Sequence, residues 1–371
     1  MKAVDPTYPL YPAASLLAAA LLLLVLLTSF IRQRWNLGVA FLCFWLFFEN
    51  LTGAINAIVW SDNSDVKLYV YCDIVSHLEI ICYTVRPMAT LIITRRLYLI
   101  ANLQSVELPS RRTRCLNALF EWSLGLVIPA LVAGSLYYIV QAARFQVVEG
   151  SGCADALYES VLMILIILSW GIAAPLLSIV FYYPQIVRLL YFRNRDVNRY
   201  LKSNDSVSRQ RYLRIFALAS IDILLTLPIN IATLVLSLSL ALDEGPIPFY
   251  PGWTFSHSSW APISTSYVEL QASMADVALF YFTDWIAPVL GFVIFALFGF
   301  TDEARASYWS VLRTGASWVG WKVPGAARGH DSGRMTMDTI RFGEPQSVSR
   351  DGETGTCSSA VAPKLEGDDA A

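Results

Sequence analysis

The chain has 371 residues, of which 56% are apolar and 15% are charged, and its formal net charge is −2. A soluble domain of this length needs far more charge to cover its surface, so the composition excludes an ordinary soluble protein. About 20 apolar residues in a helix cross a hydrocarbon core of about 30 Å, whereas barrel strands need only about ten alternating residues. The long apolar runs of this chain therefore predict membrane-spanning helices.

Seven apolar runs predict seven transmembrane helices. Arg32 and Arg34 follow the first run, which is the wrong flank for a cleaved signal peptide, so we interpret the run as the first helix. Together the runs predict an all-α membrane protein, a seven-transmembrane helix bundle over residues 1–300. The runs are Tyr8–Ile31, Leu37–Trp60, Tyr71–Ile100, Leu119–Gln141, Glu159–Leu190, Leu213–Leu242 and Gln271–Phe300.

Two segments of different character follow the seventh run. Residues 301–321 predict a short amphipathic helix on the inner membrane surface, because Trp309 and Leu312 can face the headgroups while Arg305 and Arg313 face water. Residues 322–371 are rich in Gly, Ser, Thr, Asp and Arg and poor in aliphatic residues. Such a segment cannot bury enough apolar surface to fold, so we expect a disordered tail.

Basic residues predict the orientation of the bundle. One side of the membrane would hold only Lys2, Lys67 and Arg144. Under the positive-inside rule the more basic side is cytosolic, which places the N-terminus outside and the C-terminus in the cytosol. The basic side collects Arg32, Arg34, Arg95, Arg96, Arg111, Arg112, Arg114 and the arginines between residues 193 and 214.

Two cysteines fall on the predicted outer side. Cys72 opens the third helix, and Cys153 lies in the second outer loop. Both would face an oxidising compartment, where a disulfide can form between them and tie the loop over the mouth of the bundle. Two free thiols are the alternative.

Four ionisable residues lie inside the predicted spans: Glu49, Arg86, Asp222 and Asp284. An isolated charge at membrane depth costs a few kcal/mol, so each should face the bundle interior and find a partner. Our hypothesis pairs Arg86 with Glu49 or Asp284. Together with a proline kink at Pro228 in the sixth helix, such polar contacts could favour one helix arrangement over another and act as a switch. A static polar plug with a fixed kink is the alternative.

Two groups of residues suggest a docking face for a cytosolic partner. They also satisfy the positive-inside rule and can bind anionic lipid, so by themselves they are a weak signal. Bending at Pro228 would move the second group relative to the fifth helix. The groups are Arg95, Arg96 and Tyr98 at the end of the third helix, and Arg209, Arg211 and Arg214 at the start of the sixth.

The sequence offers little support for an enzyme, a metal site, a cofactor or a nucleic-acid partner. Its three histidines are His77, His257 and His330, the last in the tail, which disfavours a membrane hydrolase with a three-histidine zinc site. A transporter or channel is the alternative function. The absence of an internal repeat in the sequence and the odd helix count disfavour it.

Six short segments, in order, carry a resemblance to a known family. The chain resembles the fungal mating pheromone receptors of the a-factor type over Tyr8 to Arg305. It departs from the family pattern at Val85-Arg86-Pro87, where small or apolar residues are expected. The segments are Ile55–Trp60, Tyr71–Ile74, Arg95–Ile100, Tyr138–Phe145 with Gly152-Cys153 after it, Tyr212–Pro228 and Phe295–Arg305.

The resemblance implies a G-protein-coupled receptor in the plasma membrane. Its ligand would be a short peptide with a farnesylated, carboxymethylated C-terminal cysteine. Its partners would be a heterotrimeric G protein, which starts a MAP-kinase mating response, and the lipid bilayer, and a homodimer is compatible with this.

The outer third of the bundle offers residues that could meet such a ligand. Asp73 and His77 share a helix face and could bind polar peptide groups. The aromatic residues could equally be interfacial anchors. The expected ligand-binding residues are Trp60, Tyr71, Asp73, His77, Tyr83 and Trp260.

Overall fold

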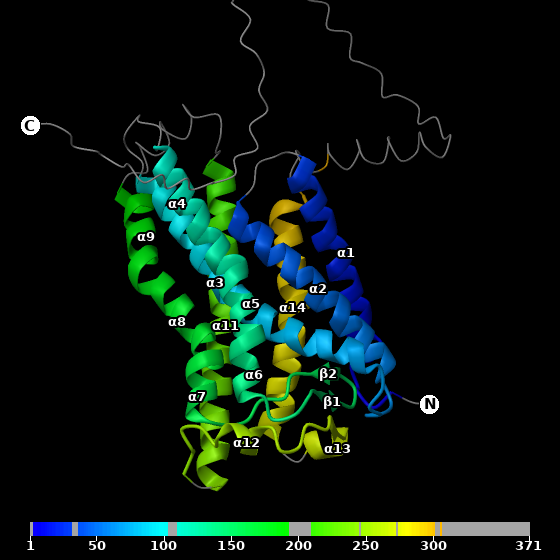
Figure 1. Cartoon of the computed structure of the whole chain (residues 1–371). Helices are drawn as coiled ribbons and strands as arrows, with labels where there is room; N and C mark the ends of the chain where they lie inside the picture. The colour runs from blue at the N-terminus through cyan, green and yellow to red at the C-terminus, as the bar shows by residue number, and fades with distance from the viewer. Residues whose placement is uncertain are drawn as a thin grey trace, which may run out of the picture.

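The fold is a bundle of long helices (Figure 1). A computed structural model describes residues 3–31, 36–102, 110–192, 209–244, 246–271 and 274–300, together with Arg305. The tail 322–371 and, apart from Arg305, the predicted amphipathic helix 301–321 lie outside the described residues.

Seven helical segments follow the seven apolar runs. Five are single α-helices, and the fourth and fifth alternate between α-helical and π-helical turns near Pro129 and Pro175. A proline removes a backbone donor from the helix ladder, and wide turns are one way to accommodate it. The single helices are α1 (Leu10–Ile31), α2 (Leu37–Val59), α3 (Tyr69–Asn102), α11 (Arg209–Glu244) and α14 (Met274–Phe298).

The two interrupted helices run without a break through their wide turns. The fourth consists of α4 (Arg111–Trp122), η1 (Ser123–Val127), α5 (Ile128–Leu131), η2 (Val132–Leu136) and α6 (Tyr137–Val140). The fifth consists of α7 (Val161–Met163), η3 (Ile164–Leu168), α8 (Ser169–Leu177), η4 (Ser178–Tyr182) and α9 (Tyr183–Phe192).

The start of α4 is the largest correction to the predicted boundaries. The helix begins at Arg111 and not at Leu119, because Ser110 caps it: the Ser110 hydroxyl accepts a hydrogen bond of 3.2 Å from the backbone N–H of Thr113. A serine cap of this kind satisfies a donor of the first turn. Hydropathy alone could not detect this polar first turn.

Six of the helical segments are long and apolar enough to cross a membrane, which supports a multi-pass membrane protein. The exception among the seven is α3, although its 34 residues are ample in length. Charged residues interrupt its apolar run, among them Glu79, Arg86 and Arg95.

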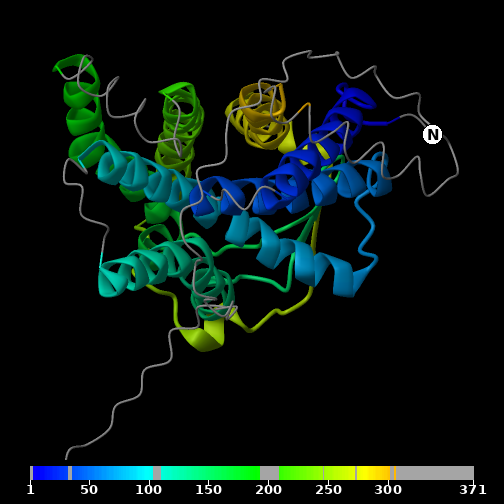
Figure 2. The ribbon, with the colours of Figure 1, turned by 90° about the horizontal axis from the view of Figure 1, so that it is seen from above.

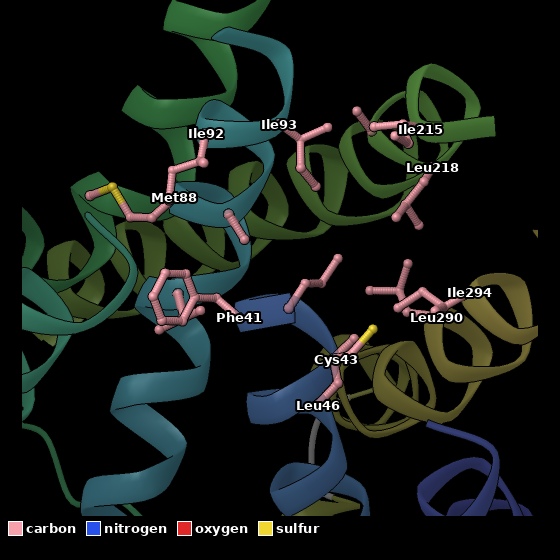
Figure 3. Packing of buried hydrophobic residues seen from close by; sticks show 14 of the residues in the cluster. Phe41, Cys43, Leu46, Met88, Ile92, Ile93, Ile215, Leu218, Leu290 and Ile294 are labelled. Carbon is pink, nitrogen blue, oxygen red and sulfur yellow. The ribbon is translucent and has the colours of Figure 1, made fainter. Parts of the chain in front are cut away.

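The helix α3 lies at the centre and contacts α2, α8, α11 and the segments of the fourth and fifth helices. Its buried residues Met88 and Ile92 join Phe41 and Leu46 of α2 and residues of α11 and α14 in one apolar cluster (Figure 3). Gly38 lets α2 approach α3 closely, because an added Cβ would lie 2.7 Å from Ile93. Between membrane helices such close packing is a main source of association.

A small sheet covers one end of the bundle (Figure 1). Its order is β2-β1-β3; β1 pairs antiparallel with β2 and parallel with β3. The β1–β2 hairpin turns through Gly150 and Gly152, whose φ angles of 91° and 83° favour glycine. We call this end the strand end and the opposite end, where α3 ends and α4 begins, the basic end. The strands are β1 (Gln146–Val148), β2 (Gly152–Ala154) and β3 (Ile263–Thr265).

The strand end also holds the short helices α12 (Trp253–Ser256) and α13 (Tyr267–Leu270). Viewed along the bundle, α14 stands between α1 and α11 and contacts both (Figure 2).

Candidate functional site

A cavity of about 370 Å³ extends from the β1–β2 hairpin to the middle of α3. This volume falls within the range of small-molecule sites, roughly 300–1,000 Å³. The hairpin contributes Ser151 and Cys153, and the walls come mainly from α2, α3, η3, α11 and α14. The lining mixes apolar residues, such as Val75 and Ile167, with carboxylates and hydroxyls.

The hairpin is fastened to α3 and to the end of α2. A disulfide joins Cys72 in the first turn of α3 to Cys153 of β2, with Cα atoms 5.2 Å apart, so the structure contains the bond considered from the sequence. The Asn56 amide donates to the Cys153 carbonyl at 3.0 Å, and the Gly150 N–H donates to the Trp60 carbonyl at 2.8 Å. These contacts hold the hairpin over the cavity.

An ion pair lies deep in the cavity. The Arg86 Nη2 atom is 3.4 Å from Glu49 Oε1, so Glu49 is the partner among the two considered. Arg86 is only 9% exposed, and its Nη1 atom has no hydrogen-bond partner among the described residues. Asp284 instead accepts a hydrogen bond of 3.4 Å from Ser151 of the hairpin.

A second polar contact joins α3 to α11. The Thr90 hydroxyl donates to Asp222, and both residues are buried. The helix α11 continues through Pro228, and two residues later the Asn230 amide donates to the Gly171 carbonyl of α8 at 2.9 Å. These residues place polar groups at the junction of three helices.

Of the six expected ligand-binding residues, only Tyr83 lines the cavity. Trp60 is fully buried, and its Nε1–H donates to the Asp65 carbonyl at 2.9 Å. The Tyr71 hydroxyl donates to Asn56 at 2.9 Å. Both aromatic side chains therefore support the base of the hairpin.

Asp73 and His77 also lie outside the cavity lining. Asp73 accepts two hydrogen bonds from Arg144, at 2.8 and 2.6 Å. The His77 ring packs edge-on against Tyr137, with centroids 5.2 Å apart. Arg144 and Tyr137, which engage these residues, could not be identified from spacing along one helix.

Trp260 belongs to an aromatic group at the strand end. Its ring stacks on His257 at 5.1 Å, and His257 stacks on Trp253 at 4.0 Å. Tyr138 meets all three rings edge-on. Trp260 is thus next to α6 and apart from the cavity lining.

The expected docking residues lie at the basic end. Arg95 donates to Asn117 of α4 at 2.7 Å, and Arg96 lies 3.7 Å from Glu121. Tyr98 packs against Tyr182, with ring centroids 5.8 Å apart. On α11, Arg209 and Arg211 lie in the first turn, where their side chains are outside the described part, and Arg214 is partly buried.

Sequence reasoning missed several residues of this arrangement. Glu79 lines the cavity and accepts a hydrogen bond of 3.0 Å from the backbone N–H of Asp155. Glu79 interrupts an apolar run, so the rule that selected Glu49 could have found it. Asp155 is a loop residue without such a signal, and burial raises its pKa to about 6. Tyr212, which donates to the Leu97 carbonyl at 3.4 Å, was hidden among apolar neighbours.

In the described part of the chain, no group of three or more His, Cys, Asp or Glu residues is arranged to hold a metal ion. Among the cavity carboxylates, Glu49, Glu79 and Asp284 come from three separate helices and contact a guanidinium group, a backbone N–H and a hydroxyl, respectively.

Comparison with known proteins gives the family. Residues 10–320 match the model of the family described as Pheromone A receptor. Similar proteins include the Pheromone B alpha 3 receptor of Schizophyllum commune, 30% identical over 307 residues (82% of this chain and 47% of that protein). Pheromone receptor 1 of Ustilago hordei is 28% identical over 300 residues (79% and 80%). The Pheromone a factor receptor of Saccharomyces cerevisiae is 24% identical over 285 residues (75% and 57%).

The chain spans about half the length of the Schizophyllum receptors that it matches. The relatives are receptors, which are not enzymes. The match covers every helical segment from α1 to α14, and it confirms the resemblance carried by the short segments. The chain therefore belongs to the pheromone A receptor family.

Proposed function

We propose that the chain is a G-protein-coupled receptor for a farnesylated peptide pheromone, which it binds in the cavity between the β1–β2 hairpin and the middle of the helix bundle. The observation that carries the proposal is this cavity, which has both apolar and polar walls, in a chain of the pheromone A receptor family. One relative is named as an a factor receptor. A lipidated peptide needs both kinds of wall.

The proposal includes seven spans, with α3 as the third. Glu79 and Arg86 line the cavity, so α3 can cross the membrane with these groups turned away from lipid. A disulfide at the strand end suits the oxidising side of a plasma membrane, and the arginines at the other end suit the cytosol. The N-terminus would then be outside and the C-terminus inside.

The prenyl group would lie between the halves of α11 and α14 nearer the strand end. Among the described side chains, no residue of α11 after Thr226 and none of α14 before Ile286 is buried. Both helix halves contribute to the cavity, for example through Thr233 and Leu279. The two helices therefore leave a loosely packed wall that an apolar chain could fill.

The polar contacts of α11 offer a route for the signal. A ligand that contacts α11 near Thr233 would bias its position relative to α3, where Thr90 meets Asp222 and Leu97 meets Tyr212. These contacts lead to the basic end, with Arg95, Arg96, Tyr98, Arg209, Arg211 and Arg214. There a heterotrimeric G protein would dock and start the MAP-kinase response.

A reporter assay tests this function. The chain is expressed in a receptor-deleted yeast strain with a matched G-protein chimera and exposed to synthetic farnesylated, carboxymethylated peptides and their unprenylated twins. We expect activation by at least one prenylated peptide and by none of the twins. Silence across a broad panel, with the receptor shown at the cell surface, would contradict the proposal.

A further inference from the structure

The cavity carries far more negative than positive groups. Five carboxylates line it, contributed by α2, α3, α14 and the loop after β2: Glu49, Glu79, Asp155, Glu159 and Asp284. Arg86 is the one basic side chain among the lining residues that the structure describes. Its Nη2 atom is already 3.4 Å from Glu49, so Glu49 largely neutralises its positive charge.

Three of these carboxylates have no basic partner within the described ranges: Glu79, Asp155 and Asp284. Glu79 accepts a hydrogen bond of 3.0 Å from the Asp155 backbone, and Asp284 accepts one of 3.4 Å from Ser151. A carboxylate removed from bulk water is costly unless a counter-charge compensates it. Such carboxylates either take up a proton or pair with a cation, and a cationic group of the ligand would supply the second kind of compensation.

Arg86 supplies a second, independent sign of a missing ligand. It is nine-tenths buried and lines the deep part of the cavity, yet its Nη1 atom has no hydrogen-bond partner among the described residues. An unsatisfied buried guanidinium donor costs free energy that an acceptor oxygen would recover. The cavity thus presents acceptors nearer the hairpin and, deeper in, the Arg86 donor next to Glu49, whose Oε2 atom also has no hydrogen-bond partner among the described residues.

We propose that the peptide part of the ligand carries a positive charge, which lies among Glu79, Asp155 and Asp284 while Arg86 donates to a peptide carbonyl. The cation is a lysine or arginine side chain or a free N-terminal amine. This inference rests on the proposed function and adds the charge of the ligand to it. Complementary charges would select basic peptides and reject acidic ones.

Binding of charge-matched peptides to the purified full-length chain in nanodiscs tests the inference. Three short farnesylated, carboxymethylated and N-acetylated peptides differ only in one residue, lysine, norleucine or glutamate, and a fourth is the norleucine peptide with a free amine. We expect the lysine or the free-amine peptide to bind at least about tenfold more tightly than the acetylated norleucine peptide, and the glutamate peptide most weakly.

Variants assign the effect to the carboxylates. Glu79→Gln should reduce the preference for the cationic peptide several-fold, and Glu79→Lys should turn it toward the glutamate peptide. Asp62→Asn is the matched control, because Asp62 is an acid at the strand end outside the cavity lining, and it should keep the preference. Equal binding of all four peptides would overturn the inference and leave the receptor function standing. No binding of any prenylated peptide would overturn both.

Discussion

At the scale of single residues, Asp155 should make the stability of the chain depend on pH. Burial raises its pKa to about 6, from an ordinary value near 3.8. Glu79 and the hydroxyls of Tyr83 and Tyr137 are its titratable neighbours. Between these pH values the folded chain binds a proton that the unfolded chain does not, so this contribution to stability is present at low pH and lost as the pH rises through about 6.

Asp155→Asn should therefore remove part of the pH dependence of stability. Relative to wild type, the variant should be more stable at pH 7.5 than at pH 5. This change in the stability difference should be on the order of 1 kcal/mol, because Asp155 is partly exposed. Thermal unfolding of the purified chain at the two pH values measures this. The Asp62→Asn chain should follow the wild type, and an unchanged pH dependence in Asp155→Asn would refute the assignment.

The buried ion pair of Arg86 and Glu49 is the second feature at the scale of single residues. Arg86→Glu places two carboxylates at the deep end of the cavity and should destabilise the chain by about 3–5 kcal/mol. The double exchange Arg86→Glu with Glu49→Arg should restore much of this loss, as seen in the melting temperature. The same exchange at Arg144 and Asp73 is the control, since both side chains are about one-third exposed or more and the reversal should change the stability little. Failure of the double exchange to recover stability would argue against a specific pair.

At the scale of elements, the hairpin depends on its disulfide. Replacing Cys72 and Cys153 by serine should lower the free energy of unfolding by about 2–5 kcal/mol, because the bond closes a long loop across 81 residues. A reducing agent should lower the melting temperature of the wild type and leave that of the double variant unchanged. A reductant shift that persists in the double variant would assign the effect elsewhere.

The contact between α3 and α11 is the second element-scale feature. Thr90→Val removes the donor to the buried Asp222, which should lower the free energy of unfolding by about 1–3 kcal/mol. If this contact holds α11 in its resting position, ligand-independent reporter activity should rise several-fold. Ser220→Ala is the control: it removes the partner of Tyr183 on another face of α11 and should leave basal activity unchanged. Unaltered basal signalling in Thr90→Val would make this contact purely structural.

At the scale of the whole molecule, the sequence predicts where the helices lie, but it does not show which side chains meet. Hydropathy locates long apolar runs, so the helix ends agreed within a few residues except at the capped start of α4. The small sheet could not be foreseen, because β1 pairs with β3 from more than 100 residues away. The same non-local packing decides which groups meet: it engages Asp73 with Arg144 and brings Asp155 beside Glu79.

The number of spans decides how the whole molecule sits in the membrane, and α3 is the test case. If α3 crosses the bilayer, the chain has seven spans and its termini lie on opposite sides; if only the six more apolar segments cross, both termini lie on the same side. We expect an N-terminal epitope tag to be stained on intact cells and a C-terminal tag only after permeabilisation. A tag placed at Asp62–Asp65, near the strand end, should also be stained on intact cells. Staining of both termini under the same condition would reject the seven-span arrangement and the orientation of the cavity that depends on it.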